Sequence, residues 1–187
     1  MTTGDIKKIV IIGPESTGKS TLCQQLAEHY HTTWCPEYAR EYLLKHGMNY
    51  TYDDLLTIAK GQIKLEEKTI QSVSSGPKLT TQYPLVFIDT DMYVMKVWCE
   101  FVFGKSHPFI LAEIRKRKYD LYLLCSVDLP WVKDELREYP DVERRQKLYG
   151  ICKDILINQS VPWTGISGNY EERLRTAITA IDSSIND

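Results

Sequence analysis

The sequence predicts an α/β fold with three layers, in which a parallel sheet of about five strands lies between two layers of helices. Short apolar runs rich in β-branched residues alternate along the chain with longer segments of helical spacing. Such alternation is typical of parallel strands joined by right-handed helical crossovers. The length of 187 residues suits one domain with one core, so we expect residues 1–187 to form a single domain.

The strands are expected where apolar runs are bounded by turn residues, because buried parallel strands read as short, nearly continuous hydrophobic segments. These runs are Lys8–Ile12, Thr33–Cys35, Leu85–Ile88, Leu121–Cys125 and Trp163–Ile166.

The helices are expected where apolar residues recur at helical spacing between these runs. These segments are Lys19–Tyr30, Glu37–Lys45, Tyr52–Gln71, Asp91–Phe103, Pro108–Arg117, Val142–Gln159 and Tyr170–Ile185. Thr51 and Asp54 have the spacing of a capping box, and Gly47 and Gly104 lie where helices commonly end. The stretch 72–84 is rich in Ser, Thr, Gly and Pro and is expected to be a loop.

Composition excludes several classes of protein. Apolar residues make up 43% and charged residues 26%, as in ordinary globular proteins, and the net charge of −2 argues against broad nucleic-acid binding. The five cysteines include no C-x-x-C pair and mostly lie in apolar stretches, which favours reduced core thiols. The chain shows neither a signal-peptide pattern nor a membrane-spanning apolar run. We therefore expect a cytoplasmic protein without a membrane partner.

The stretch 13–20, GPESTGKS, fits the phosphate-loop pattern G-x-x-x-x-G-K-[ST], and it follows an expected strand and precedes an expected helix. Its two glycines let the backbone approach a ligand so that N–H groups point at anionic oxygens, and the helix N-terminus adds partial positive charge. The alternative is a chance match at a strand-to-helix turn. The expected ATP-binding residues are Gly13, Glu15, Ser16, Thr17, Gly18, Lys19, Ser20 and Thr21.

Within this loop, Lys19 is expected at the terminal phosphates and Ser20 at Mg²⁺. Asp89 ends the run LVFID, at the carboxyl edge of the sheet where ligands of open α/β folds bind, and it resembles a Walker B aspartate. We therefore expect Ser20 and Asp89 to hold the metal. Asp91 is a further candidate for binding substrate, with capping of the next helix as the alternative.

The segment 127–146 predicts a mobile lid, because it follows a buried strand and holds a short, charge-dense helix between prolines. Arg137, Arg144, Arg145 and Lys133 lie in this segment, and a closing arginine would neutralise charge on a transferring phosphoryl group. Arg137 is the first choice, and exposed charges that only solvate a helix are the alternative. The sequence lacks the N-K-x-D segment with which GTPases recognise the base, which argues against a GTPase. The chain is also short for an AAA or helicase motor. A small-molecule kinase is therefore favoured.

Several segments together resemble the ribosylnicotinamide kinase domain of NadR-type proteins, in the same order along nearly the whole chain. The segments are GPESTGKSTL, PEYAREYL, FIDTD followed by VWCEFVFG, YDLYLLCSVDLPWVKDELR, and GNYEERL. The resemblance implies a P-loop kinase that uses Mg-ATP to phosphorylate the ribose 5'-hydroxyl of nicotinamide riboside in NAD biosynthesis. The H-x-G-H motif and helix-turn-helix common upstream in that family are missing, so we expect a free-standing kinase domain.

The resemblance also implies residues that face the acceptor. Glu37, Tyr38 and Arg40 follow the second strand; Glu37 is a candidate base or ribose-hydroxyl ligand, and Arg40 would orient it. Asp89 is the alternative base. Trp98 would stack against a pyridinium ring, whereas a core-facing stripe with Tyr93 and Phe101 is the alternative.

The expected partner is a small, nucleoside-like molecule, and the sequence leaves a homodimer open. Backbone groups near Gly168 and Asn169 would approach the adenine, with capping of the last helix by Asn169 as the simpler reading. Two other functions remain open at this point. One is a kinase for another nucleoside or a vitamin alcohol, and the other is a nucleotide-binding regulatory ATPase with little turnover.

Overall fold

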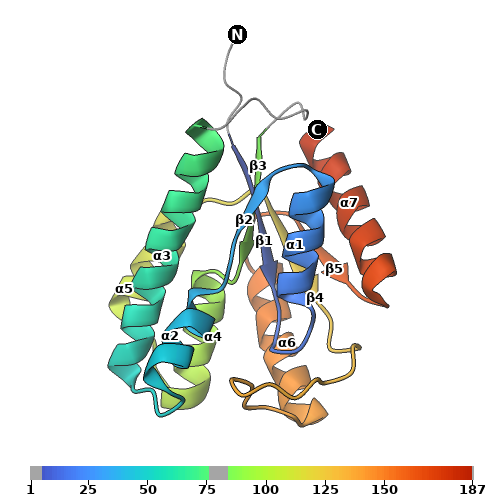
Figure 1. Cartoon of the computed structure of the whole chain (residues 1–187). Coiled ribbons are helices and arrows are strands. Elements are labelled where there is room, and N and C mark those ends of the chain that lie inside the picture. The colour runs from blue at the N-terminus through green and yellow to red at the C-terminus, as the bar shows by residue number, and fades with distance from the viewer. Residues whose placement is uncertain (1–5, 76–83, 187) are drawn as a thin grey trace.

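The computed structural model describes residues 6–75 and 84–186, and its centre is a parallel sheet of five strands (Figure 1). The strands are β1 (Lys7–Ile12), β2 (Thr33–Cys35), β3 (Leu85–Asp89), β4 (Leu121–Cys125) and β5 (Trp163–Ile166). Their order in the sheet is β2-β3-β1-β4-β5. Ile11 of β1 pairs with Asp89 of β3, and Ile12 pairs with Leu124 of β4. The ends of β1, β3 and β4 therefore meet at one edge of the sheet.

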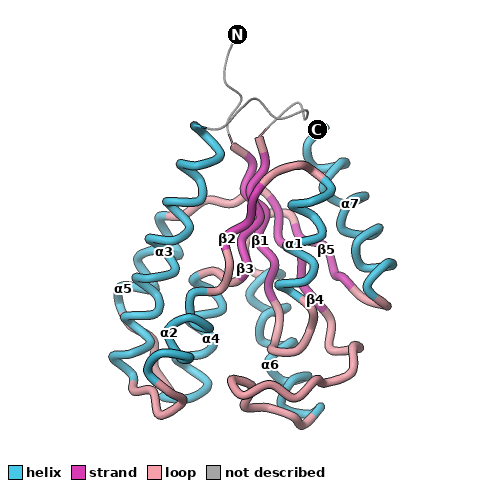
Figure 2. The backbone as a smooth tube through the Cα atoms, in the orientation of Figure 1, coloured by secondary structure: helices cyan, strands magenta, loops and turns pink. Residues whose placement is uncertain are grey.

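Helices cover both faces of the sheet and make three layers (Figure 2). α1 and α7 lie on one face, while α3, α4 and α6 pack on the other, with α2 and α5 beside α3 and α4. The helices are α1 (Lys19–His29), α2 (Tyr38–His46), α3 (Tyr52–Ser75), α4 (Met92–Phe103), α5 (Pro108–Lys116), α6 (Val142–Ile157) and α7 (Tyr170–Asn186). This is the predicted α/β/α fold.

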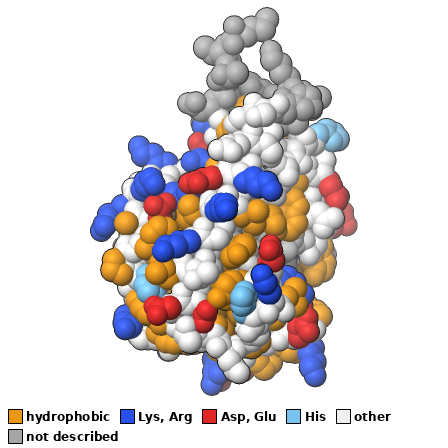
Figure 3. Space-filling view, turned by 60° about the vertical axis from the view of Figure 1, so that its left-hand side comes forward, with side chains coloured by type: hydrophobic (Ala, Val, Ile, Leu, Met, Phe, Trp, Pro, Cys, Tyr) orange, Lys and Arg blue, Asp and Glu red, His pale blue; other side chains and the backbone are white. Residues whose placement is uncertain are grey.

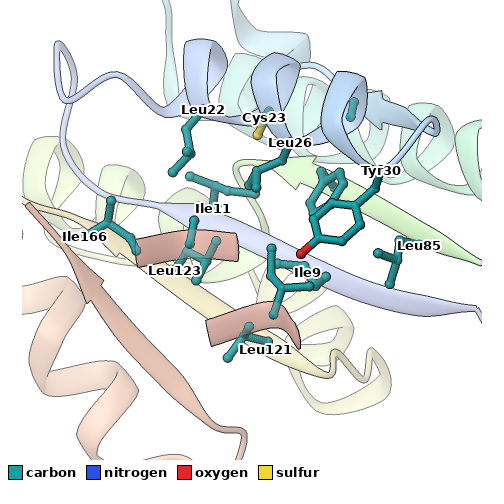
Figure 4. Packing of buried hydrophobic residues seen from close by; sticks show 14 of the residues in the cluster. Ile9, Ile11, Leu22, Cys23, Leu26, Tyr30, Leu85, Leu121, Leu123 and Ile166 are labelled. Atoms are coloured by element: carbon teal, nitrogen blue, oxygen red, sulfur yellow. The ribbon is translucent and has the colours of Figure 1, made fainter. Parts of the chain in front are cut away.

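The core under α1 shows why the strand residues alternate between two faces. Leu22 and Leu26 of α1 pack onto Ile9 and Ile11 of β1, together with Leu123 of β4 (Figure 4). The residues between them in β1 and β4 point to the opposite face, because successive strand side chains alternate. Both faces of the sheet are therefore buried, as expected for a parallel sheet.

Several boundaries agree with the sequence. Asp54 N–H donates to Thr51 Oγ1 at 3.3 Å, and Thr51 N–H donates to Asp54 Oδ2 at 2.7 Å, which confirms the capping box before α3. Gly47 ends α2 and Gly104 ends α4, as predicted.

Two predictions of local structure were wrong. α3 continues to Ser75, so Ser72–Ser75 is helical rather than loop; Ser72, Ser74 and Ser75 donate hydroxyl hydrogen bonds to the helix's own carbonyls. The rest of the predicted loop, 76–83, lies outside the described residues. The second error concerns 127–141, which contains turns but no helix, because α6 begins only at Val142. Prolines at 130 and 140 disfavour helical backbone at the residues that precede them.

The five cysteines are buried free thiols, as the sequence predicted. Among the described helices, none combines the length and the apolar character that crossing a bilayer requires. On the face that carries α3 and α5, acidic and basic side chains lie interspersed with apolar ones (Figure 3).

Candidate active site

A cavity of about 360 Å³ opens at the carboxyl edge of the sheet. The phosphate loop forms one wall, the end of β2 and the start of α2 form a second, and α4 with α6 form a third. Residues of the 127–141 loop complete the lining. The position agrees with the rule that open α/β sheets bind ligands beyond the carboxyl ends of their strands.

The phosphate loop has the backbone geometry that its glycines predict. Gly13 has φ of 143°, and a Cβ there would lie 2.7 Å from the carbonyl oxygen of Cys125, so only glycine fits. Gly18 has φ of 77° and is the N-cap of α1. Because no side chain caps the helix there, its first backbone N–H groups stay available to a ligand in the cavity. Thr17 Oγ1 donates to Pro14 O at 2.7 Å and holds the loop closed on itself. The loop is therefore built to bind an anion.

Lys19, Glu37 and Asp89 form a charged cluster at the centre of the site. Burial would lower the pKa of Lys19, but Asp89 and Glu37 outweigh it and the pKa is raised. Burial raises the pKa of Glu37 and of Asp89, and the attraction of Lys19 offsets it only in part. Lys19 is thus firmly cationic. Glu37 and Asp89 each bind a proton more tightly than the same carboxyl group does in water.

Ser20 and Asp89 lie together as the prediction of a metal site requires. Ser20 Oγ donates to Asp89 Oδ2 at 2.5 Å, and Asp89 is fully buried beneath the loop. One carboxylate and one hydroxyl are a donor set that suits Mg²⁺, which keeps several waters and binds mainly substrate phosphates. Among residues 6–75 and 84–186, no cluster of three or more His, Cys, Asp or Glu residues offers a complete protein cage for a metal.

Thr90 is a site residue that the sequence analysis missed. Its φ is 73°, a conformation that is costly for a β-branched residue, and its side chain is buried between two acidic residues. Thr90 Oγ1 donates to Asp89 Oδ1 at 3.4 Å and to Glu37 Oε1 at 3.5 Å. Such strain after a strand leaves no mark in the sequence pattern, because threonine is common in strands and turns.

The 127–141 loop is bound to the phosphate loop. The carboxylate of Glu15 accepts from the backbone N–H of Glu138 at 3.0 Å and of Tyr139 at 2.6 Å. Ser16 Oγ accepts from the N–H of Val132 at 3.1 Å. The loop that the sequence predicted to be a lid therefore lies closed over the cavity. Glu15 and Ser16, at positions that the phosphate-loop pattern leaves unspecified, hold it there.

The basic residues of 127–146 have different surroundings. Arg137 lines the cavity and donates to the carbonyl of Val132 within its own loop. Arg144 is exposed and pairs with Asp141 at 3.5 Å, and Lys133 is exposed. Arg145 is buried at 3% exposure.

The wall opposite the phosphate loop is aromatic. Trp98 lines the cavity with Trp34 and Phe101, and its Nε1 donates to the hydroxyl of Tyr50 at 3.0 Å. Tyr50 in turn donates to Glu138 Oε2 at 2.8 Å. The sequence analysis did not predict a place in the site for Trp34, Tyr50 or Glu138. Tyr50 and Glu138 lie in separate loops, and their contact depends on the closed position of the 127–141 loop.

Three predicted site residues have other partners within the protein. Arg40 lines the cavity, and its NH1 pairs with Asp134 at 3.1 Å. Burial raises the pKa of Glu37, and the charge of Arg40 still offsets part of this rise. Tyr38 packs its ring against Gly61 of α3 and does not line the cavity. Asp91 is buried and caps α4, accepting from Tyr93 N–H at 3.0 Å, so the capping alternative describes it.

The loop before α7 is tied to the phosphate loop by a buried arginine that the sequence did not single out. Arg173 donates to the carbonyls of Thr17 at 3.0 Å and Gly168 at 2.7 Å, and it pairs with Asp128. Asn169 Oδ1 accepts from the first N–H groups of α7, which confirms its role as a cap.

Comparison with protein families gives a match over most of the chain. The sequence model of a family described as an AAA domain matches residues 8–173. Among curated proteins, the "Trifunctional NAD biosynthesis/regulator protein NadR" of Salmonella typhimurium is 27% identical over 181 residues. The protein of the same name from Escherichia coli K12 is 26% identical over 181 residues. Each match covers 94% of this chain but 42% of the relative, so the chain spans less than half the length of these proteins. The predicted resemblance to NadR-type proteins is confirmed.

Solved structures share the fold. A crystal structure of NadR protein in complex with NR superposes with a TM-score of 0.78 at 23% identity, covering 97% of this chain and 50% of that one. NadR in complex with NAD and AMP-PNP gives a TM-score of 0.71 at 22% identity, with the same coverage. Thymidylate kinase from Ehrlichia chaffeensis gives 0.63 at 15% identity, covering 94% of this chain and 98% of that one. The α/β/α fold of P-loop NTPases is thereby confirmed.

Proposed function

The chain belongs to the AAA domain family, and from this premise we propose that it is an ATP-dependent kinase for a small alcohol, with nicotinamide riboside as the preferred acceptor. The observation that carries the proposal is that one cavity holds both the phosphate loop with Lys19 and a carboxylate, Glu37, on the facing wall. A site of this volume suits a small molecule beside the end of a nucleotide.

The choice of nucleotide rests on the phosphate loop and on the relatives. NadR has been crystallised with AMP-PNP, an ATP analogue, and the loop here has the backbone that such a ligand needs. The backbone N–H groups of Gly13 and of residues 15–21 would bind the phosphates, and the side chain of Lys19 would bind the terminal ones. Ser20 and Asp89 would hold Mg²⁺, which when bound neutralises phosphate charge.

The choice of acceptor rests on the chemistry of the aromatic wall around Trp98. A pyridinium ring is flat and cationic, and Trp98 offers it an aromatic face while Glu138 adds a carboxylate beside the same wall. NadR has been crystallised with NR. We infer that the nicotinamide end lies against this wall and the ribose 5'-hydroxyl points to Glu37.

In the proposed transfer the acceptor oxygen attacks the γ-phosphorus of ATP, the bond to the bridging oxygen breaks, and ADP leaves. Glu37 accepts the hydroxyl proton, and its raised pKa makes it a better base than an exposed glutamate. Lys19 and Arg137 balance the charge on the moving group. The closed 127–141 loop excludes water that would otherwise hydrolyse ATP.

An acceptor panel tests the proposal. Purified protein is incubated with ATP and Mg²⁺ and separately with nicotinamide riboside, other nucleosides and vitamin alcohols, and phosphorylated products are measured by mass spectrometry. We expect nicotinamide mononucleotide to form fastest, and Lys19→Ala to slow its formation by about two orders of magnitude or more. Transfer to another alcohol alone would replace the acceptor, and ATP binding without any transfer would indicate a regulatory protein. Absence of any heat on titration with Mg²⁺ and ATP or GTP would refute nucleotide binding altogether.

A further inference from the structure

Gln62 of α3 is a buried amide whose hydrogen bonds lead to the two segments that carry the carboxylates of the site. Its side chain is 1% exposed, although glutamine is rarely buried to this degree. Oε1 accepts from the backbone N–H of Tyr38 at 2.7 Å. Nε2 donates to the carbonyls of Pro36 at 3.3 Å and Asp89 at 3.4 Å, and it lies 3.5 Å from Cys35 Sγ. Gln62 therefore joins the backbone on both sides of residue 37 to the end of β3.

The surrounding groups fix the orientation of this amide. Its oxygen faces a backbone N–H donor, and its nitrogen faces two backbone carbonyls. The reverse orientation would place donor against donor and acceptor against acceptors, which a buried site does not tolerate. Gln62 thus has a single bonded arrangement, and it holds the segment 36–38 at a set position relative to Asp89.

The start of α2 shows what this arrangement leaves free. Glu37 is the N-cap of α2, yet its side chain makes no capping hydrogen bond and lines the cavity instead. Tyr38 is the first residue of α2, and its N–H is one of the four that a helix leaves unpaired at its start. Gln62, from another helix, accepts from that N–H. The carboxylate of Glu37 is therefore available to a ligand while the helix start is still held.

The preceding residue, Gly61, holds the same segment by a different contact. Glycine is disfavoured inside a helix, and Gly61 lies in the interior of α3. A Cβ at this position would lie 2.0 Å from Cε1 of the Tyr38 ring, so the ring rests directly on the backbone of α3, which runs beside α2 (Figure 1). Neither Gly61 nor Gln62 lines the cavity. Two successive residues outside the site thus fix the residue next to Glu37.

We propose that Gln62 is a positioning residue for phosphoryl transfer, which acts through Glu37 and sets the place of that carboxylate relative to Asp89. The inference rests on the kinase function proposed above and deepens it. Transfer requires the acceptor oxygen to be held close to the γ-phosphorus and in line with the bond that breaks. A small displacement of the group that holds the oxygen costs a large factor in rate, because the reacting atoms no longer meet in the productive geometry.

The chain offers two variants and a matched control on one helix. Gln62→Met removes the hydrogen bonds of the amide at similar length and volume, and Gly61→Ala pushes the ring of Tyr38 off α3 while the amide stays. Thr69 lies seven positions after Gln62, on the same face of α3, and is also buried. Its hydroxyl donates to the carbonyl of Leu65 within α3. Thr69→Val therefore removes a buried polar group from this face but leaves the bonds to the segment 36–38 in place.

The test separates the rate of transfer from the binding of nucleotide. Transfer from ATP to nicotinamide riboside, or to the alcohol that the acceptor panel identifies instead, gives kcat and KM. Calorimetric titration with AMP-PNP and Mg²⁺ gives the affinity and the number of folded sites. We expect Gln62→Met to lower kcat per site by about tenfold to a hundredfold, with AMP-PNP affinity and the KM for ATP within about twofold. Gly61→Ala should change these quantities in the same direction, and Thr69→Val should leave them unaltered.

A double-mutant cycle tests whether Gln62 acts through Glu37. In a Glu37→Gln background, Gln62→Met should lower kcat by less than about threefold, since the group that it positions is already altered. A residue that only supports the fold would lower kcat by the same factor in both backgrounds. Amide hydrogen exchange provides a readout without substrate: in Gln62→Met the N–H of Tyr38 should exchange about tenfold faster, because its acceptor is gone.

Equal factors in the two backgrounds would overturn the proposal, as would AMP-PNP affinity that falls in parallel with kcat, or unchanged exchange at Tyr38. Gly61→Ala carries the same comparison if Gln62→Met does not fold. If the unaltered protein phosphorylates no acceptor, the kinase proposal fails and the positioning role falls with it. If the unaltered protein transfers phosphate but Gln62→Met keeps full kcat, only the positioning role fails.

Discussion

The two hydrogen bonds of Glu15 allow a quantitative prediction about the 127–141 loop. The carboxylate accepts from the N–H groups of Glu138 at 3.0 Å and Tyr139 at 2.6 Å. A hydrogen bond to a charged group contributes about 1.5–3 kcal/mol, and partial exposure of Glu15 favours the low end. Glu15→Ala should therefore weaken closure of the loop by about 3 kcal/mol, which is about a hundredfold in the ratio of closed to open forms.

Amide hydrogen exchange measures this ratio directly, because the two amides exchange when the loop opens. We expect Glu15→Ala to accelerate exchange at Glu138 and Tyr139 by about a hundredfold, and Glu15→Gln, which keeps one neutral acceptor, by about tenfold. Arg40→Ala is the control on the same loop, since its pair with Asp134 is exposed and should change exchange by no more than about fivefold. Equal protection in Glu15→Ala and the unaltered protein would show that the carboxylate of Glu15 does not hold the loop closed.

Three further predictions concern the site and the core. Lys19→Ala should lower kcat by about two orders of magnitude or more without loss of the circular dichroism spectrum, because Lys19 acts on phosphate charge; near-normal turnover in a folded variant would contradict it. Burial raises the pKa of Asp91 to about 6, so the folded protein binds its proton more tightly and stability should fall by about 3 kcal/mol as pH rises from about 4 to above 6. Asp91→Asn, which can still cap α4 and accept from Tyr122, should lack that decline. If the difference in unfolding free energy between this variant and the unaltered protein, measured in urea, does not change with pH, the prediction is wrong. Arg117→Met leaves Glu66, 1% exposed, without its ion pair and should cost about 3–5 kcal/mol in urea unfolding; an unchanged midpoint would show that the pair contributes little.

Much of the site could be predicted because its residues lie in one contiguous motif or at the end of a strand. Gly13, Gly18 and Lys19 are specified by local spacing, and Asp89 follows from the rule that parallel strands end at the same edge. Arg40 shows the limit of such reasoning. Its spacing from Glu37 is right for a contact on one helical face, but Asp134, far along the chain, competes for the guanidinium and binds it.

The order of strands and helices along the chain, the parallel sheet and the anion-binding loop could be predicted from the sequence, because each depends on hydrophobic period or on the backbone freedom of glycine at given positions. The pairing of charges could be seen only in the folded molecule. Thr90 is strained between two carboxylates and Glu15 holds a distant loop. The Nε and NH1 of Arg145 are buried without a hydrogen bond, whereas Arg144 beside it is exposed. Desolvation and pairing depend on neighbours that folding brings together from separate elements, and no local sequence pattern records those neighbours.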